Sequence, residues 1–167
     1  MMGNEYSVAA WHDFAIAVAG ASAALAGLLF VAMSINVKEI VADPHLPPRA
    51  AGAVVTLSTP MVFSILLLDP VQSSSALGVE LIVLAILVGV ALGAMLRPRR
   101  GGQGRVDIKW VGGNALPSVL LVGSILLAGV GILSTSVRGL AWLTLAAIAA
   151  IFGGLLQAWV LLIEIRR

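Results

Sequence analysis

The sequence predicts an all-α, polytopic membrane helix bundle of five transmembrane helices, with its N-terminus outside and its C-terminus in the cytoplasm. The 167-residue chain is 60% hydrophobic and only 11% charged, and its mean hydropathy is +1.06. About a quarter of the residues of a soluble domain are charged, so most of this chain is expected to lie in lipid. Two further observations, five long apolar runs and a one-sided distribution of basic residues, give the number and direction of the spans.

The five apolar runs cover residues 14–36, 50–68, 77–96, 116–137 and 140–163. An α-helix rises about 1.5 Å per residue and the hydrocarbon core is about 30 Å thick, so each run is long enough to cross it. Residues 43–48 are expected to form a stiff turn before the second span. The few residues between the last two spans predict a tight antiparallel hairpin. We expect one transmembrane domain, residues 1–167, without a soluble part.

The first apolar run is expected to be a retained helix rather than a cleaved signal peptide. No Lys or Arg precedes Phe14, so the basic segment of a signal peptide is missing. The small-residue triplet Ala21–Ser22–Ala23, which resembles a cleavage site, lies inside the run, which continues to Asn36.

Basic residues predict the direction of the spans. Nine of the ten fall on one side of a five-span arrangement, and Arg138 falls on the other. Lys and Arg are enriched in cytoplasmic loops, which places the C-terminus inside. The nine are Lys38, Arg49, Arg97, Arg99, Arg100, Arg105, Lys109, Arg166 and Arg167. The five from Arg97 to Lys109 form a basic loop that would attract anionic lipid headgroups, at about 1 kcal/mol per side chain.

Small residues recur every four positions on three of the spans. In lipid, helices associate through close packing and interhelical hydrogen bonds, and small residues let their backbones approach. The rows are therefore expected to be helix-packing seams within the bundle or between protomers; the alternative is that the first span lines a narrow pathway. They comprise Ala19, Ala23 and Gly27, with Gly20 and Ala24 beside them, then Gly89 and Gly93, and finally Ala146, Ala150, Gly154 and Ala158.

Polar residues inside the spans are neutral. The middle of every span lacks Asp, Glu, Lys, Arg and His, which disfavours a proton-coupled transporter. Pro60 removes the donor for the Thr56 carbonyl, so this point is either a hinge or polar path or a kink satisfied locally by hydroxyls. Gln157 is expected to hydrogen-bond across a helix interface. The candidate polar set is Thr56, Ser58, Thr59, Pro60 and Gln157.

Acidic residues gather at the predicted outer ends of the spans. Asp13, Asp69 and Glu80 could concentrate cations at the mouth of an oligomeric pore; solvated helix ends are the alternative. His12 beside Asp13 supplies only two adjacent metal ligands, so no metal site is expected. The chain has no cysteine, which excludes disulfides and thiolate metal sites, and no cofactor is expected.

Catalytic motifs are missing from the sequence. It contains no G-x-S-x-G and no H-E-x-x-H, and its two histidines, His12 and His45, are predicted on opposite faces of the membrane. We therefore expect a protein that is not an enzyme. The net charge of +2 reflects loop bias, and nucleic-acid binding is not expected.

The stretch WHDFAIAVAGASAALAGLLFVAMSIN, from Trp11 to Asn36, followed by LPPRA at 46–50 and LLLDP at 66–70, resembles a group of small integral membrane proteins of actinobacteria. The resemblance covers about the first seventy residues. It implies a multi-pass protein of the bacterial cytoplasmic (inner) membrane and supplies no functional residues.

Two classes of function remain open on this sequence. The first is a non-enzymatic protein that works by association, as a homo-oligomer or as an accessory subunit that modulates a membrane complex. The alternative is an oligomeric channel or a carrier of small solutes or lipid. The expected partners are the bilayer, with anionic lipid, and another membrane protein or a second copy of the chain.

Overall fold

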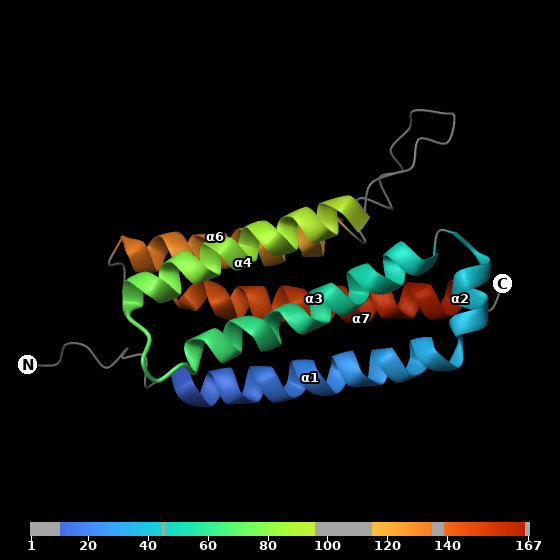
Figure 1. Ribbon diagram of the computed structural model, residues 1–167, viewed down its shortest axis with the longest axis horizontal. Coiled ribbons are helices and arrows are strands. Elements are labelled where there is room, and N and C mark those ends of the chain that lie inside the picture. The colour runs from blue at the N-terminus through green and yellow to red at the C-terminus, as the bar shows by residue number, and fades with distance from the viewer. Residues whose placement is uncertain (1–10, 45, 96–114, 135–138, 166–167) are drawn as a thin grey trace, which may run out of the picture.

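Six helices make up the part of the chain that the computed structural model describes, which is residues 11–44, 46–95, 115–134 and 139–165. They are α1 (His12–Ile35), α2 (Val37–Ala42), α3 (Leu46–Leu67), α4 (Ser74–Met95), α6 (Leu116–Leu133) and α7 (Ala141–Ile165) (Figure 1). All but α2 are long and apolar enough to cross a membrane. The predicted all-α fold with five spans is therefore confirmed.

The five long helices lie side by side, and each runs opposite to the one before it (Figure 1). The helix α3 packs against α1, α4 and α7, and α6 packs against α4 and α7. The short helix α2 lies across one end of the bundle, between α1 and α3 (Figure 1). Because the number of long helices is odd, α1 begins at one end of the bundle and α7 finishes at the other.

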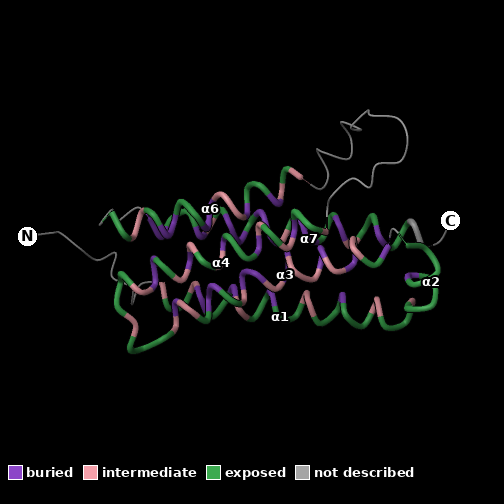
Figure 2. The backbone as a smooth tube through the Cα atoms, turned by 45° about the horizontal axis from the view of Figure 1, so that its top comes forward, coloured by how far each residue is buried: buried purple, intermediate pink, exposed green. Residues whose placement is uncertain are grey.

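Burial separates a four-helix core from a peripheral helix. In α3, 56% of the most apolar stretch is buried, whereas the figure for α1 is 22%. Figure 2 shows exposed residues along most of α1. The core between the other four helices is filled by apolar side chains that are at most 2% exposed, including Phe63, Leu81, Leu121, Ile125 and Leu143. The helix α1 lies at the side of this core, against α3, and adds Ala15 and Val18 to it.

Glycines meet at one close crossing of two helices and at the turn that leads into α7. A Cβ atom placed on Gly129 of α6 would lie 2.8 Å from the carbonyl oxygen of Gly78 in α4. A Cβ placed on Gly131 would lie 2.7 Å from the Cα atom of Gly139, at the start of the return into α7. Backbones in direct contact are the arrangement that small residues permit in lipid, where helices gain stability from packing rather than from leaving water.

Several helix boundaries differ from the predicted spans. The helix α3 begins at Leu46, so the stiff turn predicted over 43–48 is wrong in its second half. Pro47 and Pro48 lie in the first turn of α3, where backbone N–H groups have no helical acceptor and proline is tolerated. The helix α2 was not predicted, because six residues are too few to show a helical pattern.

The start of α4 and the end of α6 also differ from the predicted spans. The helix α4 starts three residues earlier than predicted because the Ser73 hydroxyl accepts a hydrogen bond from the Ala76 N–H at 3.2 Å and caps the first turn. The helix α6 ends at Leu133, and the predicted end of that span at Val137 lies outside the described residues.

Candidate functional site

The outer side of α1 carries small residues. The residues Ala15, Val18, Ser22 and Leu29 are buried, and they mark the side of α1 that faces the bundle. At 3.6 residues per turn, Gly20, Ala23, Ala24 and Gly27 lie on the opposite side of the helix, and all four are exposed. We call these four residues the α1 small-residue face. Ala19, at its edge, is half-buried.

The space in front of the α1 small-residue face is open. Among the described residues, a Cβ placed on Gly20 or on Gly27 would meet no atom within 4 Å. Larger apolar side chains, Ile16 and Val31, lie one turn beyond the face at its two ends, and both are more than half exposed. No other described helix covers the α1 small-residue face.

The small residues predicted on α7 and α4 are placed differently. In α7, Ala146 and Ala150 are fully buried and Ala158 is half-buried. A Cβ on Gly154 would lie 2.5 Å from the Cγ and Cδ2 atoms of Leu57 in α3. In α4, a Cβ on Gly89 would lie 3.3 Å from a Val122 methyl of α6. The α7 row and Gly89 therefore serve contacts within one chain.

Gly93, the second member of the α4 pair, is exposed, and a Cβ there would meet no described atom within 4 Å. Sequence reasoning missed several of the close contacts, including those at Gly78, Gly129 and Gly153. A Cβ on Gly153 would lie 2.4 Å from the Pro117 Cβ of α6. Gly78 and Gly129 have no small residue four positions away towards the middle of their helices, so the repeat pattern does not reveal them.

The threonines near Pro60 bond to their own helix. Thr56 and Thr59 are almost fully buried. The Thr56 hydroxyl donates to the Gly52 carbonyl oxygen at 2.8 Å, and the Thr59 hydroxyl donates to the Val55 carbonyl oxygen at 2.7 Å. Neither bond reaches the Thr56 carbonyl, the group that Pro60 deprives of its helical donor. Ser58, the remaining predicted hydroxyl, is half-buried.

Three buried polar side chains lie on α1, α3 and α7. Ser22 of α1 and Ser64 of α3 are fully buried, and Gln157 of α7 is 7% exposed. Their side-chain oxygen and nitrogen atoms have no hydrogen-bond partner within the described residues. Gln157 lies against Gly52 of α3, and the hydrogen bond expected across a helix interface does not form with any described group.

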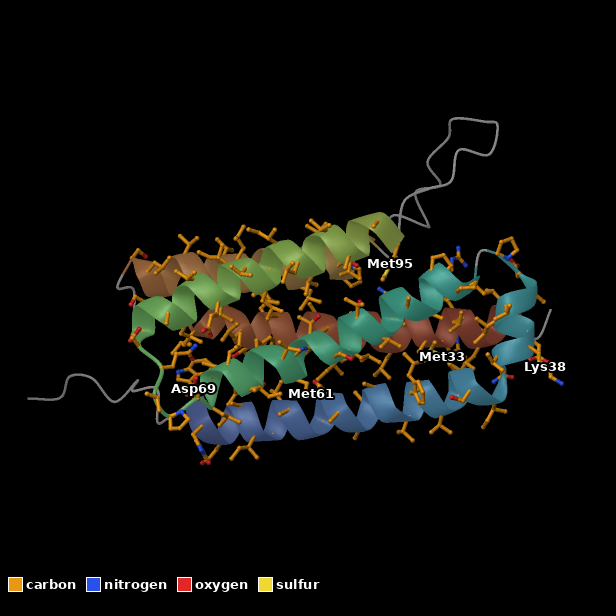
Figure 3. All side chains as sticks on the ribbon, viewed as in Figure 1. Met33, Lys38, Met61, Asp69 and Met95 are labelled. Carbon is orange, nitrogen blue, oxygen red and sulfur yellow. The ribbon has the colours of Figure 1, made fainter. Side chains whose placement is uncertain are left out.

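The acidic residues Asp13, Asp69 and Glu80 belong to one end of the bundle, and Asp69 lies at the opposite end from Lys38 (Figure 3). Asp13 and Asp69 are exposed. The Asp69 carboxylate accepts a hydrogen bond from the Val71 N–H at 3.0 Å, an Asx turn that shapes the link into α4. Glu80 is half-buried and accepts a hydrogen bond from the Gln72 amide.

This acidic end does not form a metal site within the described chain. No group of three or more His, Cys, Asp or Glu side chains there is close enough to hold an ion. The His12 Nδ1 atom lies 3.7 Å from an Asp13 carboxylate oxygen, and both side chains are exposed. The basic loop, with Arg97, Arg99, Arg100, Arg105 and Lys109, lies outside the described residues.

A function for this chain has to be inferred from its fold and from the faces of its helices. No model of a protein family matches the chain, and neither a curated protein nor a solved structure matches it. Five apolar helices identify a multi-pass membrane protein. Its most distinctive surface in the described part of the chain is the α1 small-residue face.

Proposed function

We propose that this chain is a non-enzymatic, multi-pass protein of a bacterial inner membrane that acts by association through α1. Its partner is a second copy of the chain, or another membrane protein that it modulates as an accessory subunit. The observation that carries the proposal is the position of the α1 small-residue face, directly opposite the side of α1 that packs on α3.

The energetics of a bilayer support this use of the face. Lipid tails are as apolar as leucine, so two helices gain little by removing apolar side chains from lipid, and their association depends on close packing. The stretch of α1 between Ile16 and Val31 is about 22 Å long at 1.5 Å per residue, enough for contact with several turns of a partner helix. Small residues along this length allow the partner backbone to approach closely.

The arrangement of the bundle supports it as well. The buried residues of α1, Ala15 and Val18 among them, lie on the side that joins the core of the bundle, so the outward side of α1 is not needed for the fold of one chain. The buried polar side chains of the described residues are serine, threonine and glutamine, none of which is ionised. Association through α1 therefore explains these two features better than a reaction on a bound substrate would.

Leucine substitutions on α1 test this proposal. Gly20→Leu and Gly27→Leu each place a bulky side chain on the α1 small-residue face, so we expect the associated fraction to fall at least tenfold while the monomer stays folded. Single-molecule photobleaching in liposomes measures subunit number, and crosslinking in cells with identification of neighbours distinguishes self-association from a foreign partner. Gly93→Leu, on the open side of α4, is the matched control and should leave association unchanged.

Two results would contradict the proposal. One is a monomeric wild type that captures no neighbour in cells. The other is equal association of the Gly20→Leu and Gly93→Leu variants, which would show that the α1 small-residue face is not the contact.

We further propose that the N-terminus lies outside and the C-terminus in the cytoplasm. The support is the excess of basic residues in alternate loops, together with the placement of Lys38 and Arg49 at the opposite end from Asp13 and Asp69. A fluorescent protein that matures only in the cytoplasm should be active at the C-terminus and inactive at the N-terminus. A phosphatase that is active only outside should give the reverse pattern, and activity of one reporter at both termini would reject this orientation.

A further inference from the structure

The short helix α2 carries two apolar side chains that the bundle does not cover. Of its six residues only Ile40 is buried, whereas Val37 is 51% exposed and Val41 is 69% exposed. The two valines are four residues apart, so they lie on the same side of α2. Glu39 is also exposed and lies about 160° around the helix from each of them. One exposed side of α2 is therefore apolar, and the opposite side carries a carboxylate.

Hydrogen bonding and packing fix the position of α2. A single residue, Asn36, joins it to α1, and the Asn36 carbonyl oxygen accepts a hydrogen bond from the Ile40 N–H at 3.0 Å. Ile40 belongs to a buried cluster that includes Leu46 of α3 and Leu161 of α7. The helix lies across the end of the bundle (Figure 1), so it follows the membrane plane when the long helices cross the bilayer.

Two exposed tryptophans of α7 give the level of α2 in the bilayer. Trp142 is 41% exposed and Trp159 is 66% exposed. They are 17 positions apart, which is about 26 Å at 1.5 Å per residue and close to the hydrocarbon thickness of about 30 Å. Tryptophan is enriched at both membrane–water interfaces, so the pair marks the two boundaries. Leu161, in the cluster of Ile40, lies two residues beyond Trp159, and α2 is therefore level with one boundary.

The surroundings of α2 at this boundary favour lipid on its valine side. The apolar outer surface of α1 includes Val31 and Ile35, which are 55% and 76% exposed, and it ends one residue before α2. A helix in the plane of the interface turns its apolar side to the acyl chains and its charged side to water. Lys38 of α2 is exposed, and its long stem allows the ammonium to reach the headgroups.

We propose that the lipid leaflet at this end of the bundle is the partner of α2, with Val37 and Val41 among the acyl chains just below the headgroups and Glu39 facing water. The helix thereby anchors the connection between α1 and α3 at the membrane surface and sets the depth of both. This contact is separate from association through the α1 small-residue face, and it holds for a monomer and for an oligomer.

Spin labels on α2 test this placement. The chain has no cysteine, so each introduced cysteine carries a unique label. Val37→Cys, Val41→Cys and Glu39→Cys each change an exposed residue, so no buried contact is lost. In liposomes of phosphatidylcholine and phosphatidylglycerol, EPR power saturation measures collisions of the label with oxygen, which concentrates among acyl chains, and with a nickel chelate, which stays in water. We expect the oxygen-to-nickel collision ratio to be at least threefold higher at positions 37 and 41 than at 39.

Ile86→Cys provides the hydrocarbon reference, because this residue is 56% exposed in the middle of α4. Its oxygen-to-nickel ratio should exceed those at both valine positions. A ratio at 37 and 41 no higher than at 39 would place the valines in water and overturn the proposal. Low collision rates with both reagents at 37 and 41 would show that a second copy of the chain covers them, which would overturn it as well.

Quenching by spin-labelled lipids supplies a second readout of depth. With a fluorescent dye on the same cysteines, we expect a lipid that carries its nitroxide at carbon 5 to quench positions 37 and 41 at least twofold more than one that carries it at carbon 12. The order should reverse at position 86. Stronger quenching by the carbon-12 lipid at 37 and 41 would place α2 deep in the hydrocarbon and contradict its position at the surface.

Discussion

Gly129→Ala is expected to destabilise the protein by about 1–3 kcal/mol, the usual cost of overpacking a well-packed interior. The new methyl would lie 2.8 Å from the Gly78 carbonyl oxygen and 3.2 Å from the Ile82 backbone nitrogen. Both atoms belong to the backbone of α4, so no rotation of a side chain relieves the contact. The two helices must move apart, and the close packing on which they depend in lipid is lost. Gly129→Val should cost more, because a branched side chain forces a wider separation.

Reversible unfolding by SDS titration in mixed micelles, followed by circular dichroism, measures this loss. Gly123→Ala is a matched control in the same helix, and it should be neutral or stabilising because alanine favours the helix over glycine by about 1 kcal/mol. Equal stability of the Gly129→Ala and Gly123→Ala variants would show that the α4–α6 crossing is looser than this contact requires.

Leu57 and Gly154 are expected to behave as a coupled pair. Gly154→Ala places a methyl 2.5 Å from the Leu57 Cγ atom, and Leu57 is only 1% exposed, so its side chain is enclosed by the bundle. We expect the single substitution to cost about 1–3 kcal/mol. Leu57→Ala alone should also destabilise, by less than the 2–5 kcal/mol of water-soluble cores, because the transfer contribution is small when lipid is the solvent.

The double variant Leu57→Ala/Gly154→Ala should recover part of the loss, since the new methyl enters the space that the leucine leaves. A coupling energy of about 0.5–3 kcal/mol is typical of residues in contact. The same SDS titration measures it, and Leu57→Ala combined with Gly123→Ala provides an additive reference. Additive effects of Leu57→Ala and Gly154→Ala would place the two residues out of contact.

The candidate site shows where sequence reasoning stops. The row of Ala19, Ala23 and Gly27, with Gly20 and Ala24 beside it, could be predicted from spacing alone. Whether that row faces the bundle or the lipid could not be predicted. In a soluble helix the apolar side is the buried side. Every side of a transmembrane helix is apolar, so its hydropathy pattern does not show which side faces the bundle.

The polar positions show the same limit. Spacing places Thr56 and Pro60 one turn apart, but it does not show that the Thr56 hydroxyl bonds back to Gly52. Nor does it show that Gln157, which is more than ninety residues away in the sequence, lies against Gly52. Contacts between distant segments depend on the packing of α3 on α7, which no local pattern encodes.

For this chain, the five spans and their alternation could be read from the amino-acid sequence, because lipid admits only long apolar helices whose backbone groups bond to one another. The order of helices around the core, the peripheral place of α1 and the meeting of Gly78 with Gly129 became visible in the folded bundle. These features depend on how the surfaces of different helices fit together, and once all surfaces are equally apolar, shape rather than hydropathy selects the neighbours.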